Sequence, residues 1–284
     1  MKIFTTVKDM KNFSRECHCA GKIIGLVPTM GALHEGHLSL VKASKEKCDV
    51  TIVSVFVNPT QFAPNEDFDA YPRTFEKDVA KLKLLGVDAI FHPSPEEMYP
   101  AGFSTYVNVE GGLTKKLCGA SRPTHFRGVA TVVTKLMNIT QADESFFGQK
   151  DAQQVAVVKR FVTDLNLSPK VNMLPIVREE SGLALSSRNA YLTSEEKISA
   201  LALSRGLKKA EATFFAGEKN SAALKKIVAD ELATEPSISA DYIELLKYPS
   251  LEETEFVEGE SLLAAAIFIG KTRLIDNIIL TPNS

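Results

Sequence analysis

Short apolar runs alternate with amphipathic segments along the first part of the chain. The run at 23–27 ends at a proline, and residues 38–47 after it have a helical pattern. The run at 50–57 is almost entirely β-branched or aromatic, which is typical of a strand buried on both faces. A second helical pattern at 75–85 is closed by Gly86, the residue type favoured just past a helix end. The pattern therefore predicts two strand–helix units.

The same alternation continues to about residue 177. The further elements that we expect are a strand at 89–91, a helix at 129–139, a strand at 145–147, a helix at 152–162 and a strand at 171–177. Strands that alternate with helices form right-handed β–α–β units. This part of the chain therefore predicts an α/β fold with a doubly wound, Rossmann-like parallel sheet.

The pattern changes after about residue 180. The elements expected there are helices at 194–216 and 221–232, followed by strands near 241–246, 262–269 and 273–280. Helices followed by strands are typical of an α+β domain. We therefore predict a first domain at 1–178 and a second, smaller α+β domain at 179–284, with a boundary near 175–182.

Composition excludes several classes of protein. The 33 basic and 35 acidic residues leave a net charge of −2, without the basic excess of a dedicated nucleic-acid binder. The longest apolar run, 262–269, is far short of the roughly 20 residues of a membrane helix. Four cysteines and no signal-peptide pattern favour a cytoplasmic location. The sequence Cys17-His18-Cys19 lacks the ligand spacing of structural zinc sites, so we expect no protein-bound metal there.

Candidate chemistry lies in the loops that follow the strands, because ligands of open α/β sheets bind beyond the carboxyl ends of the strands. The first such loop places His34 and His37 three residues apart at the start of a helix, which puts both rings on one side. Gly36 leaves the backbone there accessible to an anion. A single histidine is more often a surface or core residue, but two imidazoles in an H-x-G-H sequence favour a phosphate site.

Two further loops carry polar candidates. Gln61 follows a strand and a proline, and can either bind a substrate with hydroxyl and carboxylate groups or hold loop backbone. Lys150 precedes a helix, where a cation opposes the helix dipole unless an anion lies between them. Asp151 is a candidate helix cap, and Gln154 lies one turn further along.

Basic residues in two other segments are candidates for binding a phosphate. Arg122 and Arg127 flank the start of a predicted helix, and Arg178 precedes a Ser186-Ser187-Arg188 sequence at the expected domain boundary. Scattered arginines are usually solvated, but a polar loop at a domain junction has the features of a mobile phosphate clamp.

The motifs resemble those of known families. The chain has neither a Walker loop nor a dinucleotide fingerprint. Its H-x-G-H sequence is similar to the signature of nucleotidyltransferases, which attack the α-phosphate of ATP. Seven ordered blocks resemble the pantothenate synthetase family: PTMGALHEGH at 28–37, FVNPTQF at 56–62, YPRT at 71–74, GASRPTHFRGV at 119–129, FFGQKD at 146–151, LALSSRN at 183–189 and RLIDN at 273–277.

The resemblance implies ATP-dependent condensation of pantoate with β-alanine through a pantoyl adenylate, with Mg²⁺ as a cofactor. It also implies a homodimer and a second domain that acts as a lid. Catalytic roles are implied for His34, His37 (as proton donor), Lys150 and Arg188, and pantoate and β-alanine contacts for Gln61 and Gln154. The implied ATP contacts are Met30, Gly31, Ala32, Leu33, His34, Glu35, Gly36, His37, Gly148, Gln149, Lys150, Asp151, Val177, Leu185, Ser186, Ser187 and Arg188.

Two alternatives stay open from the sequence. One is a different nucleotidyltransferase of the same superfamily, which keeps the transferred nucleotide in its product. The other is a tRNA-binding or regulatory module that retains the fold without catalysis. Release of AMP that depends on an amine substrate separates the predicted ligase from both.

Overall fold

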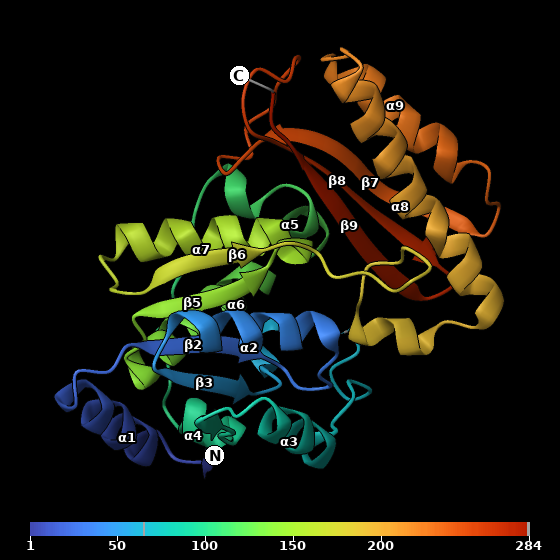
Figure 1. Cartoon of the computed structure of the whole chain (residues 1–284). Coiled ribbons are helices and arrows are strands. Elements are labelled where there is room, and N and C mark those ends of the chain that lie inside the picture. The colour runs from blue at the N-terminus through green and yellow to red at the C-terminus, as the bar shows by residue number, and fades with distance from the viewer. Residues whose placement is uncertain (65, 283–284) are drawn as a thin grey trace. The chain divides into compact units, whose positions relative to one another are not determined.

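The chain forms two compact units. The computed structural model describes residues 1–64 and 66–282 (Figure 1). The first unit comprises 1–110 and 121–175, and the second comprises 111–120 and the residues from Ile176 onward. The boundary thus falls three residues before the predicted one, and 111–120 joins the second unit, which no hydrophobic pattern indicated. The Sγ of Cys118 lies 3.4 Å from the Tyr242 hydroxyl, a contact over 124 positions that only tertiary structure reveals.

A parallel sheet forms the centre of the first unit. Its strands are β1 (Lys2–Phe4), β2 (Ile24–Thr29), β3 (Val50–Val55), β4 (Ala89–Phe91), β5 (Glu144–Gly148) and β6 (Lys170–Leu174). They are hydrogen-bonded in the order β1-β4-β3-β2-β5-β6, and every pair is parallel. The predicted α/β class with a Rossmann-like parallel sheet is confirmed.

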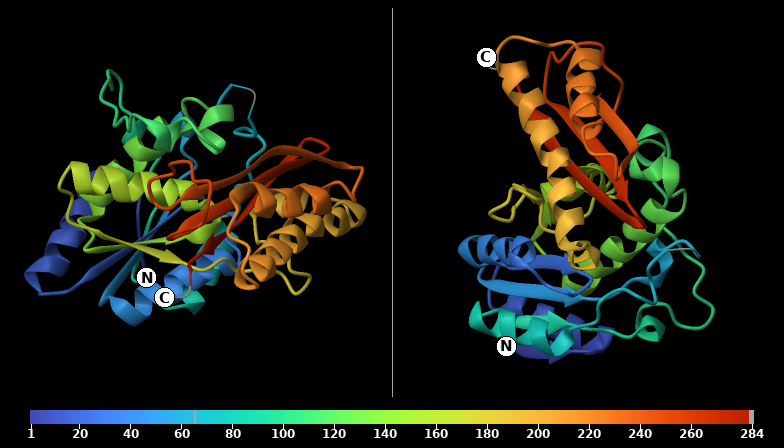
Figure 2. Two further views of the ribbon diagram at one scale, coloured as in Figure 1. Left: turned by 90° about the horizontal axis from the view of Figure 1, so that it is seen from above. Right: turned by 90° about the vertical axis from the view of Figure 1, so that its right-hand side faces the viewer.

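Helices cover both faces of this sheet (Figures 1 and 2). They are α1 (Val7–Cys19), α2 (Glu35–Lys47), α3 (Phe75–Leu84), α4 (Pro95–Met98), α6 (His125–Thr140) and α7 (Ala152–Asp164), with short 3₁₀ turns η1 (Pro59–Gln61) and η3 (Gln149–Asp151). Val53 packs in one core with α2 and α3. Its neighbour Ile52 points to the opposite face and is also fully buried, while α6 contacts both α1 and α7. Burial on both faces explains why these strands are continuously apolar.

Several element boundaries differ from the predicted ones. The strand β1 and the helix α1 were not predicted, although Thr6 caps α1 by accepting the Asp9 N–H at 3.1 Å. The helix α6 begins four residues earlier than its predicted start, because His125, Arg127 and Gly128 interrupt the apolar pattern in its first turn. The strand β6 ends before Pro175, whose missing N–H cannot extend a ladder.

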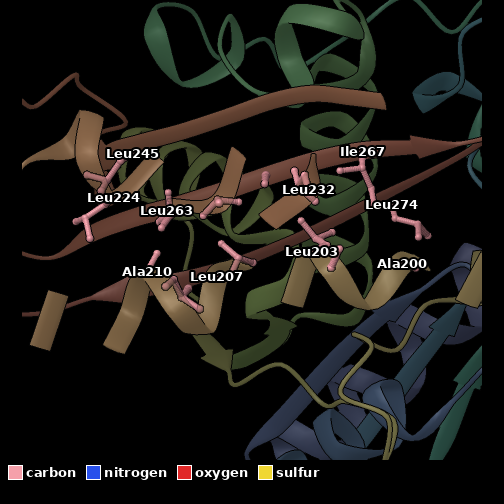
Figure 3. Close-up of a cluster of buried hydrophobic side chains, with 14 of the residues drawn as sticks. Ala200, Leu203, Leu207, Ala210, Leu224, Leu232, Leu245, Leu263, Ile267 and Leu274 are labelled. Carbon is pink, nitrogen blue, oxygen red and sulfur yellow. The ribbon is translucent and has the colours of Figure 1, made fainter. Parts of the chain in front are cut away.

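The second unit is an antiparallel sheet covered by two helices. Its elements are η2 (Gly112–Thr114), α5 (Cys118–Ser121, which ends in the first unit), η4 (Ser187–Tyr191), α8 (Ser194–Phe215), α9 (Ser221–Leu232), β7 (Ile238–Lys247), β8 (Ser261–Ile269) and β9 (Thr272–Leu280). The strands pair in the order β7-β8-β9. Leu207, Leu224 and Leu263 belong to the core between the helices and the sheet (Figure 3). The predicted smaller α+β domain is confirmed.

Candidate active site

The strand order of the first unit identifies one edge of the sheet as the place for a ligand. From β2 the chain continues to β3 and β4 on one side, and it later adds β5 and β6 on the other side. In open α/β sheets, ligands bind beyond the carboxyl ends of the strands where the order reverses. In this sheet the order reverses between β2 and β5. The loops after β2, β3 and β5 carry residues 30–37, 58–61 and 149–151. The predicted residues of the first unit therefore gather at this edge.

The two histidines meet in the first turn of α2. The helix begins at Glu35, three residues before its apolar pattern, and His34 is its N-cap. The ring centroids of His34 and His37 are 4.1 Å apart, and the His34 backbone N–H donates to Nδ1 of His37 at 3.4 Å. In a neutral His37 ring the proton therefore sits on Nε2, which becomes a donor. Gly36 lies between them, in the first turn of α2, where backbone N–H groups lack the i−4 acceptors of a regular helix. The His37 N–H donates to the His34 carbonyl at 2.8 Å.

Both rings are neutral at pH 7. Burial is the main cause that lowers the pKa of His34 to about 4, and the positive charges of Lys150 and Lys81 act in the same direction while Asp151 opposes them. Burial likewise lowers the pKa of His37 well below its usual range, with contributions from His34, Lys150 and Lys81. Since Lys150 acts on both rings, the loops after β2 and β5 share one electrostatic environment. The imidazoles are hydrogen-bond donors here without being cations.

Asp78 of α3 is a functional candidate that the sequence analysis missed. Its carboxylate is 1% exposed, and it accepts the Ala32 N–H at 2.9 Å and the Leu33 N–H at 2.8 Å. One turn later, Lys81 donates from Nζ to the Leu33 carbonyl at 2.5 Å. The helix α3 therefore holds the backbone of the loop before the histidines, and the N–H groups of Ala32 and Leu33 bind Asp78. A carboxylate in a helical first turn is so common that its sequence carries no signal of this role.

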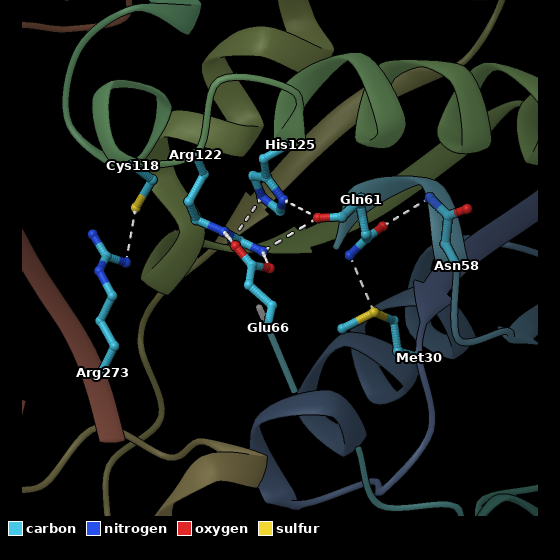
Figure 4. Close-up of polar contacts among 8 residues, drawn as sticks. All are labelled: Met30, Asn58, Gln61, Glu66, Cys118, Arg122, His125 and Arg273. Atoms are coloured by element: carbon cyan, nitrogen blue, oxygen red, sulfur yellow. Dashed lines mark hydrogen bonds and ion pairs between the residues drawn. The ribbon is translucent and has the colours of Figure 1, made fainter. Parts of the chain in front are cut away.

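Gln61 is held at the same edge by a chain of side-chain contacts (Figure 4). Asn58 donates from Nδ2 to Oε1 of Gln61 at 3.0 Å, and Nε2 of Gln61 lies 3.1 Å from the sulfur of Met30. Two residues predicted as ligand contacts, Met30 and Gln61, therefore touch each other. The packing beneath them is tight, because a Cβ on Gly128 of α6 would lie 2.3 Å from the Thr60 carbonyl oxygen.

The basic residues near the start of α6 have partners inside the protein. Arg122 donates from Nε to Glu66 at 2.6 Å, and its guanidinium also donates to Nε2 of His125 at 3.1 Å (Figure 4). Nδ1 of His125 must then donate to the Gln61 carbonyl, which lies 2.9 Å away. The guanidinium of Arg127 stacks on Tyr106 at 3.9 Å. These two arginines therefore have partners inside the protein, and a contribution of their charge to a phosphate stays a prediction.

The loop after β5 continues into the helix α7. Gly148 ends β5, and Gln149, Lys150 and Asp151 form the 3₁₀ turn η3. Asp151 occupies the N-cap position of α7, yet its side chain makes no capping bond, so capping does not account for its presence. Gln154 lies in the first turn of α7 and is half-buried.

The remaining predicted contacts belong to the second unit. The Leu185 N–H donates to the Val177 carbonyl at 3.0 Å, so these two residues pair next to the isolated antiparallel bridge between Arg178 and Ala184. Ser186 accepts the Arg188 N–H at 3.2 Å and caps η4, which includes Ser187. Their approach to the residues of the first unit stays a prediction.

No metal cage or membrane-crossing helix occurs in the described part of the chain. Within residues 1–64 and 66–282, no group of three or more His, Cys, Asp or Glu side chains has the arrangement to hold a metal ion. None of the helices in those ranges combines the length and the apolar character needed to cross a bilayer.

The ring of His18, which lies between Cys17 and Cys19, contacts a backbone group: it lies 2.8 Å from the Gln141 carbonyl oxygen.

Comparison with known proteins decides the family. Residues 2–279 match the family described as Pantoate-beta-alanine ligase. The chain belongs to the pantoate–β-alanine ligase family. Members of this family are AMP-forming ligases that synthesise pantothenate, so the predicted enzyme class is confirmed.

Relatives and solved structures agree with this assignment. The chain is 55% identical to a pantothenate synthetase of Pelotomaculum thermopropionicum and 53% identical to one of Carboxydothermus hydrogenoformans, over 99% of each chain. A pantothenate synthetase structure from Thermus thermophilus matches with a TM-score of 0.94 at 40% identity, covering 99% of this chain and 100% of that one. A pantoate–β-alanine ligase from Francisella tularensis, complexed with Beta-gamma ATP and β-alanine, matches with a TM-score of 0.81 at 36% identity, covering 98% and 97%.

Proposed function

We propose that this ligase condenses pantoate with β-alanine in two steps through an enzyme-bound pantoyl adenylate. In the first step a pantoate carboxylate oxygen attacks the α-phosphorus of ATP, and the bond to the β-phosphate breaks to release pyrophosphate. In the second step the β-alanine amine attacks the acyl carbon, and AMP leaves. The observation that carries the proposal is the contact between the His34 and His37 rings in the first turn of α2, where the charge of Lys150 contributes to lowering the pKa of both.

The roles of the residues follow from charge. Two anions must approach each other, and negative charge then grows on the α-phosphate and the leaving pyrophosphate. We assign Lys150 and the N–H groups at the start of α2 to that charge, with Nε2–H of His37 and the His34 ring as neutral donors. Arg188 is proposed as a second cation, brought to the phosphates by the second unit.

The substrate contacts fall to the amide side chains. Gln61 is oriented by Asn58 and Met30, and Gln154 lies in the first turn of α7. Both amides are proposed to bind pantoate, with Gln61 also contacting β-alanine. Pantoyl adenylate is a mixed anhydride that water destroys, so closure of the second unit over the site would protect it.

The residues at this edge fit an Mg²⁺ ion that is bound mainly by the phosphates of ATP. Mg²⁺ keeps several waters and is usually bound through substrate phosphates with one or two carboxylates. A three-ligand protein cage is therefore not required, and Asp151 is a carboxylate beside Lys150 at this edge. The ion would neutralise phosphate charge. A homodimer remains a prediction from the family resemblance, and a cytoplasmic location remains a prediction from the composition.

One assay tests the two-step reaction. The protein is incubated with ATP, Mg²⁺, pantoate and β-alanine, each omitted in turn, and pyrophosphate, AMP and pantothenate are quantified. We expect one enzyme-equivalent burst of pyrophosphate without β-alanine, and AMP release only when β-alanine is present. Release of ADP and phosphate, or a product that retains the nucleotide, would overturn the proposal.

A further inference from the structure

The RLIDN block of β9 lies far in sequence from every predicted ligand contact. Its residue Asp276 nevertheless binds Arg178, which lies in the loop that carries the predicted ATP contacts Val177 and Leu185. Asp276 is 3% exposed and lies on the same face of β9 as the core residues Leu274 and Ile278. A carboxylate on an apolar face requires a charged or hydrogen-bonding partner. The guanidinium of Arg178 supplies one, with Nη1 donating to Oδ2 at 2.6 Å and Nη2 to Oδ1 at 3.0 Å.

Arg178 belongs to a hairpin that ends at the predicted phosphate clamp. It pairs with Ala184 in an antiparallel bridge, and Glu179 donates its N–H to the Leu183 carbonyl at 2.8 Å. The turn closes at Gly182, which has a φ of +97° and whose N–H donates to the Glu179 carbonyl at 2.8 Å. The guanidinium of Arg178 also donates to the Gly182 carbonyl at 3.2 Å. One side chain therefore binds both the turn of the hairpin and the sheet.

A second side chain joins the hairpin to the clamp itself. Asn189 of η4 is 5% exposed and donates from Nδ2 to the Glu179 carboxylate at 2.9 Å and to the Ala184 carbonyl at 3.1 Å. Its own N–H donates to the Ser186 carbonyl at 3.0 Å. The segment 185–188 thus lies between two tethered points, Ala184 and Asn189.

We propose that Arg178 and Asp276 are positioning residues that hold the hairpin 177–185 on β9 and thereby set the place of the ATP-contacting segment 185–188. This inference rests on the proposed function of that segment. Arg178 does not serve as a phosphate ligand here, because its charge is already matched by a buried carboxylate. A bidentate pair fixes orientation as well as distance, which an apolar contact does not.

Two conservative variants test the proposal on the full chain. Asp276→Asn keeps the size but removes the charge, and Arg178→Lys keeps the charge but loses the two-pronged geometry. We expect the KM for ATP to rise roughly 10- to 100-fold in Asp276→Asn and by less in Arg178→Lys, as for a displaced binding group. The KM values for pantoate and β-alanine should stay within about twofold, since the proposed contacts of those substrates lie in the first unit.

Asp241→Asn is the matched control. Asp241 accepts from Arg273 at 2.7 Å in another ion pair of the same sheet. This pair has no contact with the hairpin 177–185, so the KM of Asp241→Asn for ATP should equal that of the wild type. Thermal melting of every variant shows whether it is folded at the assay temperature. If Asp276→Asn does not fold, the KM of Arg178→Lys tests the proposal. An unchanged KM for ATP in the folded variants would overturn the positioning role. Failure of the wild type and the control to form pantothenate would instead overturn the proposed function.

Discussion

Neutral imidazoles at the start of α2 suit a site that must bind ATP and release pyrophosphate. Burial and two nearby lysines lower the pKa values of His34 and His37, so the positive charge in this region resides on Lys150 and Lys81. An approaching triphosphate would favour protonation of both rings, because a nearby negative charge raises a histidine pKa. The rings can therefore donate hydrogen bonds in either state.

Replacing His37 or Lys150 by alanine should slow the first chemical step. We expect the rate of pyrophosphate formation in a single turnover to fall by roughly 10² or more, the scale of losing one transition-state donor. The measurement is rapid quenching of enzyme mixed with ATP and pantoate. His18→Ala is the control, because that ring contacts the Gln141 carbonyl and has no part in the proposed site. Near wild-type rates in both variants would exclude the assigned roles.

Acid should weaken the fold through the buried histidines. The pKa values of His34 and His125 are lowered to about 4 in the folded chain, against about 6.5 in an unfolded one. Between these values the unfolded chain binds more protons, so the free energy of unfolding falls as the pH decreases from about 6.5 to about 4. Protonation of His125 would also place two cations together, because its Nε2 accepts from Arg122.

Urea unfolding at about pH 7 and about pH 5 checks this pH dependence. The midpoint should be lower at the acidic pH, and His125→Asn should show a smaller difference between the two midpoints. Equal differences in both proteins would mean that His125 does not contribute.

At the scale of elements, α3 acts as a support for the loop after β2. Asp78→Asn should disturb that loop, because the amide replaces one acceptor oxygen by a donor that faces a backbone N–H. We expect a loss of about 1–3 kcal/mol in the free energy of unfolding and a rise of roughly 10-fold or more in the KM for ATP. Chemical denaturation and steady-state kinetics measure the two effects. Asp9→Asn, an exposed aspartate in the first turn of α1, is the control; it should leave the KM for ATP unchanged and cost less than about 1 kcal/mol of stability.

The contact of α6 with η1 makes Gly128 essential for placing Gln61. A Cβ there would meet the Thr60 carbonyl oxygen at 2.3 Å and the Gln61 Cα at 2.7 Å. Gly128→Ala should therefore destabilise the protein by about 1–3 kcal/mol, as overpacking does, despite the better helix propensity of alanine. The KM for pantoate should rise. Gly259→Ala, with open space at its Cβ, should leave both the melting temperature and that KM unchanged.

The elements with long periodic patterns were predictable, and the tertiary contacts were not. The helix at 221–232 has its predicted bounds because its apolar spacing and its Asn220 cap coincide. The gathering of the first-unit candidates followed from the rule that parallel strands end at one edge. The roles of Asp78 and Asp276 depend on partners 45 to 98 positions away, which no local pattern encodes. The assignment of 111–120 to the second unit also depends on contacts with residues far away in sequence, so the sequence did not predict it.

At the scale of the whole molecule, the proposed function requires residues of both units to bind the same ATP. The first unit carries the histidines and Lys150, and the second carries Arg188 in η4, next to the hairpin 177–185 that Arg178 ties to β9. If the second unit supplies a cation to the phosphates, Arg188→Ala should raise the KM for ATP and slow adenylate formation by roughly 10². Single-turnover kinetics at several ATP concentrations measure both. An unchanged KM and rate would confine ATP recognition to the first unit.

Following the carboxylate oxygen atoms of pantoate tests the adenylate intermediate most directly. Pantoate labelled with ¹⁸O in its carboxylate is converted with ATP and β-alanine, and the products are analysed by mass spectrometry. Attack of that carboxylate on the α-phosphorus predicts one ¹⁸O atom in AMP and the other in pantothenate. Unlabelled AMP, or label in pyrophosphate or inorganic phosphate, would contradict the adenylate route.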